Sequence, residues 1–408
     1  MRRLRLIRDG GEGRPQRILV ARLGDPGLTV QAAPALRRAV ELAGRDNVYV
    51  AVDVVDRFVV DELRIIPPEN VIELRSGSNG EIWRDVRAAA RIARKAKVDA
   101  AVDLSFSSHR SAALVAMSGA RRRAGLHSPK GTGPQRGDLM THRVAPNPVL
   151  HASLAFLAIV DVLSEAPEDL PAIDRPPAPL VPAPLALPSP VESAQVEDIA
   201  SHILRHRRDP LVMLIDPNMG DAVGLRRWPD DRYVELTRKL LTHFKDLVVL
   251  VTGTPPEAQH AEDLARLVGS DRCASVAGKL SVRQQLALYH RADVLVTHNS
   301  VAAHLAGLTP IDVVTLFGPE SPEAFGVVGE RAHGIWAGIP CSPCMHAAND
   351  RRTSCADNAC MRHVEVPVVV HQVRAILERR AQAAMSGPPA AFAAPAGTPG
   401  PATFSPWA

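Results

Sequence analysis

The chain is poor in aromatic residues and cysteines and has no long apolar run. Aromatic side chains make up only 4% of its 408 residues, so Leu, Val and Ala must form most of the core. No apolar run approaches the roughly 20 residues of a membrane-spanning helix. A net charge of +4 is too small to indicate nucleic-acid binding. The basic start, MRRLRLIRDGGEGRPQR, is not followed by a signal-peptide-like apolar segment, so we expect a cytoplasmic protein.

Short runs rich in Val and Ile alternate with helix-length amphipathic segments along most of the chain. This alternation is typical of parallel sheets covered by helices on both faces. It predicts the α/β class, with two Rossmann-like, doubly wound parallel-sheet domains facing across a cleft. The strand-like runs are 17–22, 47–53, 70–75 and 98–104 in the first half, and 211–216, 246–253, 272–278, 292–298 and 311–318 in the second. Helices are predicted over 30–43, 81–96 and 366–384.

Nine prolines between residues 166 and 190 predict an extended linker, because proline fits neither a helix interior nor a central strand. The last residues contain little besides Pro, Ala and Gly, which is typical of disorder. The predicted organisation is a basic flexible N-terminus (1–16), a first Rossmann-like domain (17–165), the linker (166–190), a second Rossmann-like domain with a Cys cluster and a closing helix (191–385), and a disordered tail (386–408).

Two segments of the second half place charged residues just after predicted strands. In DPNMGDAVGLRRWPDDRYVELTRKL (216–240), Arg226 would stand beside the carboxyl end of a strand, where a diphosphate could bind. In VTGTPPEAQHAEDL (251–264), Glu257 lies in a first helical turn. Its carboxylate could accept both hydroxyls of a ribose or could simply suit the helix dipole.

A third segment, VLVTHNSVAAHLAG (294–307), ends a strand and begins a helix at Asn299 or Ser300, both good N-cap residues. The free N–H groups of Ser300, Val301 and Ala302 would form an anion site. One turn further, His304 is either a packed residue or part of that site.

Four of the five cysteines lie close together in CSPCMHAANDRRTSCADNACM (341–361). In a cytoplasmic chain such a cluster favours thiolate metal binding over disulfides. Structural zinc or a rubredoxin-like iron would suit four thiolates, and packed or redox-active thiols are the alternative. The predicted metal ligands are Cys341, Cys344, Cys355 and Cys360.

A basic triplet, Arg121–Arg123, precedes a loop that contains further cations. It could face an acidic acceptor or a membrane. A solvated charged surface is the default interpretation of such a run.

Taken in order, six pieces of the chain resemble glycosyltransferase family 9, the ADP-heptose lipopolysaccharide heptosyltransferases. The resemblance covers about residues 17–385 and implies a GT-B fold with inverting transfer of a heptose from an ADP-sugar. The matching pieces are ILVARLG…APALR (18–37), RRWPDDRYVEL (226–236), VVLVTGTPPE (248–257), HNSVAAHLAG (298–307), VVTLFGPESP (313–322) and CSPC…CM (341–361).

The resemblance also implies roles for individual residues. Arg226 takes the place of a phosphate-binding Lys, Glu257 matches a ribose-binding Glu, and Ser300 matches the helix start that binds the pyrophosphate. His304 matches the family's His in the same motif. The second domain would thus bind the ADP-sugar and the first would present a glycolipid acceptor, such as lipopolysaccharide core, near Arg22, Gly24 and Gly27. No organic cofactor and no nucleic acid are implied, and peripheral contact with the inner membrane is an added possibility.

Two positions depart from the family pattern. The expected catalytic Asp falls on Leu28, and the second motif reads Asn299-Ser300-Val301 where the family has Asp-Ser/Thr-Gly. An inverting displacement needs a base near the acceptor hydroxyl, and Leu28 cannot serve. Three interpretations remain: a remodelled turn brings in Asp25, another residue such as His109 or Asp103 acts, or the protein is a weakened nucleotide-sugar-binding or scaffold homologue. A metal-bound Cys cluster would favour a further alternative, a protein O-heptosyltransferase.

Overall fold

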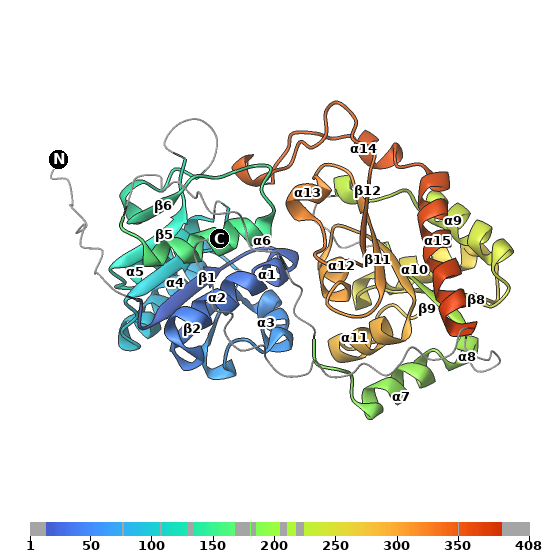
Figure 1. Ribbon diagram of the computed structural model, residues 1–408, viewed down its shortest axis with the longest axis horizontal. Helices are drawn as coiled ribbons and strands as arrows, with labels where there is room; N and C mark the ends of the chain where they lie inside the picture. The colour runs from blue at the N-terminus through green and yellow to red at the C-terminus, as the bar shows by residue number, and fades with distance from the viewer. Residues whose placement is uncertain are drawn as a thin grey trace, which may run out of the picture.

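The computed structural model describes residues 14–75, 77–106, 108–128, 134–167, 180, 185–204, 210–217, 224–349 and 351–385. They form two lobes, each built on a parallel sheet of six strands, which stand side by side in Figure 1. The predicted α/β class with two doubly wound parallel sheets is confirmed. Most of the predicted linker, the first residues and the tail lie outside the described residues.

The first lobe runs from β1 to α6, and its sheet has the order β3-β2-β1-β4-β5-β6. Its elements are β1 (Ile18–Arg22), α1 (Pro26–Gln31), α2 (Ala33–Ala43), β2 (Val48–Asp53), α3 (Arg57–Leu63), β3 (Val71–Leu74), α4 (Asn79–Lys95), β4 (Ala100–Asp103), α5 (His109–Met117), β5 (Arg122–Leu126), β6 (His142–Val144) and α6 (Ala152–Asp161).

The second lobe runs from β7 to α15, and its sheet has the order β12-β11-β10-β7-β8-β9. Helices α7 (Pro190–Ile199) and α8 (Ser201–Leu204) precede it. Its elements are β7 (Leu211–Asp216), α9 (Asp230–His243), β8 (Leu247–Val251), α10 (Ala258–Val268), β9 (Cys273–Ser275), α11 (Val282–Arg291), β10 (Val294–His298), α12 (Val301–Ala306), β11 (Asp312–Phe317), α13 (Pro322–Phe325), β12 (Ala332–Trp336), α14 (Ala359–Arg362) and α15 (Val366–Met385).

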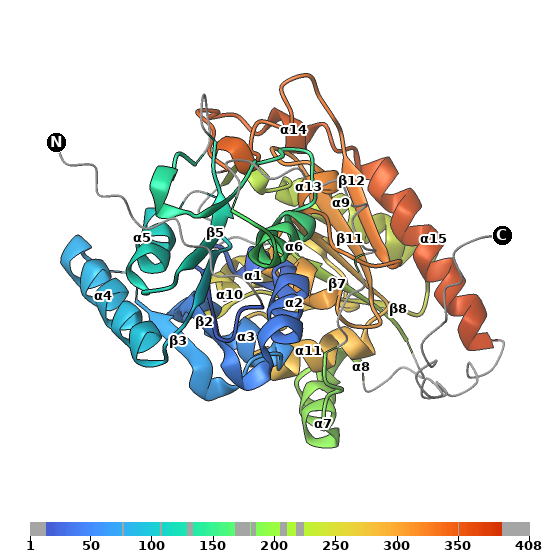
Figure 2. The ribbon, with the colours of Figure 1, turned by 60° about the vertical axis from the view of Figure 1, so that its left-hand side comes forward.

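Alternate residues of each strand bury opposite faces of the sheet. In β1, Leu19 packs with α4 and α5, whereas Ile18 and Val20 pack on the side of α1, α2 and α6. The apolar cluster on that second side continues without a break into α11 and α12 of the second lobe. The outer face of the second sheet is covered by α9, α10 and α15. Figure 1 shows α1 and α6 facing α12 and α13 across the boundary between the lobes, and Figure 2 shows the molecule turned by 60°.

Two local predictions are wrong. The helix predicted over 30–43 is two helices with a turn at Ala32, because Pro34 has no N–H for the carbonyl of Val30 and its ring would clash there. The basic triplet is not a solvated surface, since Arg122 and Arg123 are buried in β5. Arg123 donates hydrogen bonds to the carbonyls of Leu139 and Ala120. In the described part of the chain, no helix is both long and apolar enough to cross a membrane.

Candidate active site

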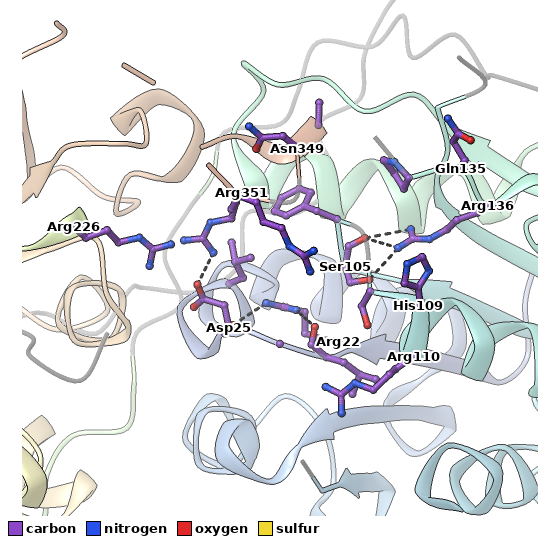
Figure 3. A pocket seen from close by; sticks show the side chains of 18 residues that line it. Arg22, Asp25, Ser105, His109, Arg110, Gln135, Arg136, Arg226, Asn349 and Arg351 are labelled. Atoms are coloured by element: carbon purple, nitrogen blue, oxygen red, sulfur yellow. Dashed lines mark hydrogen bonds and ion pairs between the residues drawn. The ribbon is translucent and has the colours of Figure 1, made fainter. Parts of the chain in front are cut away.

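A cavity of about 1000 Å³ opens at the point in the first sheet where the strand order reverses, between β1 and β4. Strands β1 and β4 are neighbours, and the chain leaves them on opposite sides, so a crevice forms at their carboxyl ends. The turn after β1 and the start of α5 form its floor, and residues from the second lobe close it (Figure 3). The second sheet has the same arrangement at β7 and β10, and Arg226, which follows β7, lines the cavity from the second lobe.

The lining of this cavity is strongly basic. Among the described residues, six arginine side chains line it, against a single carboxylate, that of Asp25. Arginine forks bind phosphate and carboxylate groups through paired hydrogen bonds, so the cavity suits a ligand with several negative charges. The six are Arg22, Arg110, Arg136, Arg226, Arg351 and Arg352.

Asp25 is the N-cap residue of α1, and its Oδ1 accepts a hydrogen bond of 2.8 Å from the N–H of Gly27. The turn before it is held by Arg22, which donates to the carbonyls of Leu23 and Asp25. The other carboxylate oxygen of Asp25, Oδ2, accepts a hydrogen bond from Nη1 of Arg351 at 2.5 Å. Burial raises the pKa of Asp25, but Arg351, Arg226 and Arg22 outweigh it and hold the pKa well below its usual value. The carboxylate is therefore ionised at neutral pH.

Arg351 joins Asp25 to a buried network in the second lobe. Its Nε donates to Oε1 of Glu320 at 2.5 Å, and Nη2 of Arg226 donates to the same oxygen at 3.1 Å. Oε2 of Glu320 accepts from Nδ2 of Asn299 at 2.6 Å. Nε2 of His304 lies 3.1 Å from Oδ1 of Asn299. One chain of polar contacts therefore links three of the predicted donor-site residues to the predicted base.

The two histidines of the third motif are buried and neutral. Burial lowers the pKa of His304 to about 4 and that of His298 to about 3. Nε2 of His298 accepts from the N–H of Trp228 at 2.8 Å, so two of the motifs noted in the sequence are directly hydrogen-bonded. Trp228, which is buried, also donates from its indole to the carbonyl of Val364. These contacts hold Trp228 in place, and Trp228 directly follows Arg226 and Arg227 in the chain.

Ser300 is the N-cap of α12, and its hydroxyl accepts from the N–H of Ala303 at 3.3 Å. A small pocket beside the large cavity is lined by Ser300, Asn299, His304 and Gly27 among others. Val301 and Ala302 follow in the first turn of the helix. Gly27 of the first lobe lies against this turn, because a Cβ on it would be 3.6 Å from the N of Val301.

Glu257 lines neither of these two cavities. Its Oε2 accepts from the N–H and the hydroxyl of Thr254, at 2.6 and 2.7 Å, so it closes a capping box. It nevertheless follows β8, which is next to β7, and therefore lies at the same edge of the sheet as Arg226. Its role at a ribose stays a prediction.

The alternative bases differ in access. Asp103 is completely buried and forms an ion pair of 3.0 Å with Arg136, so it cannot meet a substrate. His109 and Leu28 both line the large cavity. Arg22 and Gly24, predicted on the acceptor side, line it too. Of the two acids that sequence reasoning considered, only Asp25 reaches the cavity.

All of the cysteines are free thiols. Burial raises the pKa of Cys360, and nearby Cys344 and Cys341 add to this effect. Cys355 is exposed. Within the described ranges, no three His, Cys, Asp or Glu side chains are grouped as metal ligands would be. Zinc or iron on the four thiolates stays a prediction.

Sequence reasoning missed Glu320 and Arg351. Glu320 lies three positions after the end of β11, and a carboxylate just after a parallel strand is a signal that could have been used. Arg351 lies among the cysteines in a segment considered only for metal binding. Figure 3 shows it beside Arg226, with Asp25 below them.

Comparisons with known proteins identify a family and a fold that match this chain. The sequence profile of glycosyltransferase family 9 (heptosyltransferase) matches residues 86–353. Lipopolysaccharide heptosyltransferase 2 of Salmonella typhimurium is 30% identical over 112 residues, which cover 27% of this chain and 32% of that protein. Lipooligosaccharide heptosyltransferase 2 of Haemophilus influenzae is 24% identical over 110 residues, 26% of this chain and 31% of that one. The matched segments span about a third of these curated relatives.

Solved structures match over more of the chain. The Escherichia coli ADP-heptose lipopolysaccharide heptosyltransferase II has a TM-score of 0.66 and 16% identity, with 90% of this chain and 99% of that one covered. A family 9 glycosyltransferase from Veillonella parvula has a TM-score of 0.62 and 18% identity, with 78% and 85% covered. An Escherichia coli heptosyltransferase solved with ADP has a TM-score of 0.58 and 15% identity, with 88% and 99% covered. At such identities the likeness establishes the fold, and the expected GT-B arrangement is confirmed.

Proposed function

Because the chain belongs to glycosyltransferase family 9, we propose that it transfers a heptose-type sugar, with inversion, from an ADP-sugar to a glycolipid acceptor such as lipopolysaccharide core. The observation that carries the proposal is the basic cavity between the two lobes, in which Asp25, the one carboxylate among the described lining residues, bonds Arg351 and lies near Arg226. The choice of ADP-heptose rests on the solved relatives whose names include ADP or ADP-heptose.

The chemistry of an inverting transfer needs one base and one anion site. The acceptor hydroxyl attacks the anomeric carbon while the bond from that carbon to the diphosphate breaks, and the leaving diphosphate takes the electron pair. Asp25 is placed to take the hydroxyl proton, and it is ionised because of its arginine neighbours. Arg226 and Arg351 are placed to stabilise the charge that develops on the diphosphate.

Product analysis by mass spectrometry tests the proposal. The full chain is incubated with ADP-heptose, ADP-glucose, UDP-sugars and GDP-sugars, with a heptose-free lipopolysaccharide core as acceptor, and NMR gives the anomeric configuration. We expect heptose transfer with inversion from ADP-heptose. Asp25→Asn should lower kcat about 10²- to 10⁴-fold, the usual effect of a lost general base. Absence of binding and transfer with every donor would refute the proposal.

Leu28→Asp tests the rival view that the protein only binds nucleotide-sugars. Leu28 lines the same cavity as Asp25, so the substitution puts the family's carboxylate back at its usual position. If the natural chain is silent and Leu28→Asp transfers sugar, the natural chain is a binding module. If instead the natural chain transfers sugar with Leu28 in place and Asp25→Asn does not, the result supports the remodelled turn.

We also propose that α4 contacts an anionic membrane surface, where a glycolipid acceptor would lie. Its exposed Arg84, Arg87, Arg91 and Lys95 fall within about 80° of one another on the helix surface, at 100° per residue. They form no ion pair with another described residue, and Trp83 beside them is 41% exposed. Figure 2 shows α4 at the outer edge of the first lobe.

Sedimentation with phosphatidylglycerol vesicles tests this contact. Each cation near an anionic surface contributes about 1 kcal/mol, so Arg87→Ala with Arg91→Ala should weaken binding about 30-fold. The matched control, Lys239→Ala with Arg266→Ala, removes two exposed cations of the second lobe. Equal binding of both variants would exclude α4 as the contact.

A further inference from the structure

We propose that Arg351 binds the donor diphosphate, and that it exchanges its ion pair with Asp25 for that diphosphate, so that the base is released only when donor is present. The inference rests on the proposed function and adds to it the exchange of partners at Arg351 and an order of events. It comes from the way one arginine is shared between two lobes and two carboxylates.

Arg351 is held by two contacts that differ in strength. It bonds Glu320, whose side chain is only 1% exposed, within its own lobe. Across the lobe boundary it bonds Asp25, whose side chain is 33% exposed. A buried carboxylate that loses its partner is far more costly than one that water can reach. If a competing anion arrives, the contact with Asp25 is therefore the one that breaks.

The guanidinium of Arg351 is oriented for such an exchange. It lies over the ring of Phe325, with its central carbon 4.8 Å from the ring centroid, and this contact fixes its plane. Nε is committed to Glu320 and Nη1 to Asp25, while Nη2 has no hydrogen-bond partner among the described residues. Arg351 lines the large cavity (Figure 3). Nη1 and Nη2 together form the fork that binds phosphate oxygens.

The backbone supports the same view. Arg351 has a φ of 54°, a left-handed conformation that residues other than glycine rarely adopt. Such a conformation persists where surrounding contacts impose it. In this chain those contacts are the Asp25 and Glu320 carboxylates and the Phe325 ring.

The exchange orders the reaction. While Arg351 occupies Oδ2 of Asp25, that oxygen is not free to accept a proton from an acceptor hydroxyl. Once the diphosphate takes Nη1 and Nη2, Oδ2 faces the cavity and its proton affinity rises. The acceptor oxygen then bonds to the anomeric carbon, the bond from that carbon to the diphosphate breaks, and the proton passes to Asp25. The acceptor hydroxyl therefore loses its proton only after the donor has bound.

Calorimetric titration of the full chain with ADP, and with AMP as the probe that lacks a diphosphate, tests the exchange. We expect Arg351→Gln to bind ADP at least tenfold more weakly and to bind AMP as the natural chain does. Asp25→Asn should bind ADP several-fold more tightly, because Arg351 no longer has to leave a carboxylate. In the Arg351→Gln background, Asp25→Asn should have little effect, which a double-mutant cycle measures. Arg266→Gln, which removes an exposed arginine of α10 outside the lining of the cavity, is the control and should not change ADP affinity.

The outcomes separate this inference from the proposed function. If the natural chain binds no ADP, the proposed function fails. If it binds ADP and Arg351→Gln binds ADP equally well, or loses ADP and AMP alike, only the exchange is overturned. Should Arg351→Gln not fold because the buried Glu320 loses one of its two arginine partners, Arg351→Gln with Glu320→Gln keeps the charge balanced and carries the same expectation.

Discussion

Acidification should destabilise this protein through His298, a residue that connects two motifs of the second lobe. Its side chain is 1% exposed, and Nε2 accepts from the N–H of Trp228 and lies 3.0 Å from the hydroxyl of Tyr233. Burial, with a smaller contribution from the nearby Arg227 and Arg226, lowers the pKa of His298 from 6.5 to about 3. A proton on Nε2 would remove the acceptor that Trp228 needs.

The sign and size follow from these pKa values. The folded pKa is lower than the unfolded one, so the stability contribution is present above about pH 6.5 and is lost as the pH falls toward 3. Between about pH 7 and pH 4.5, the unfolded chain gains about one proton that folded His298 does not. At 1.36 kcal/mol per pKa unit, this lowers the free energy of unfolding by about 2–3 kcal/mol.

Urea unfolding of the natural chain and of His298→Gln, followed at both pH values, measures this term. The glutamine should reduce the loss between the two pH values by about 2–3 kcal/mol, because it does not titrate while all carboxylates stay the same. His371→Gln, on the exposed side of α15, controls for the removal of one imidazole. The same pH dependence in the natural chain and in His298→Gln would refute the reasoning.

Three further predictions concern the lobe boundary and the thiols. Gly27→Val should separate the lobes, because even a Cβ at this position would lie only 3.1 Å from Cδ2 of His304. The radius of gyration in X-ray scattering should rise and ADP binding should weaken. An unchanged radius and affinity would contradict this. Arg283→Gln breaks a bridge from α11 to Glu62 of the first lobe and Glu192 of α7, but its side chain is 26% exposed, so urea unfolding should show a loss of only about 1 kcal/mol or less, smaller at high salt. A loss of several kcal/mol would show that the bridge is stronger than a surface pair. If the metal prediction is right, elemental analysis should find about one zinc or iron per chain. A variant with serine at the predicted ligands should hold none. Metal-free natural protein would refute metal binding by Cys341, Cys344, Cys355 and Cys360.

Sequence patterns predicted the strands that carry the site but missed others. Runs such as those of β1 and β10 are apolar and β-branched because they are buried on both faces, so their composition reveals them. Strands β5 and β12 contain RRAGL and AHGIW, in which Arg, His and Gly hide the pattern. Arg122 and Arg123 looked solvated because a single sequence does not show which backbone carbonyls will accept their hydrogen bonds.

The candidate site was predicted where it depends on local signals and missed where it depends on tertiary contacts. Ser300 was found as an N-cap because capping is a property of neighbouring residues. The ion pair between Arg351 and Asp25 joins positions 326 residues apart, and no local pattern specifies it. Glu320 lies within one of the family-like pieces, VVTLFGPESP (313–322), but only the fold shows that its partners are Asn299 and Arg351.

The two departures from the family pattern now have a physical account, and each has a neighbour that compensates for it. Asp25 and Leu28 are three residues apart, about one helical turn, so they lie on the same side of α1, and both line the cavity. A carboxylate at position 25 therefore stands about 5 Å along the helix axis from position 28 and reaches the same cavity. At the second position, Asn299 donates to Glu320 at 2.6 Å. An aspartate at position 299 would place two carboxylates in contact, whereas the amide of Asn299 donates a hydrogen bond to the carboxylate of Glu320. The pair keeps one negative charge beside Arg226 and Arg351, and the basic cavity keeps its balance even though both motif residues have changed.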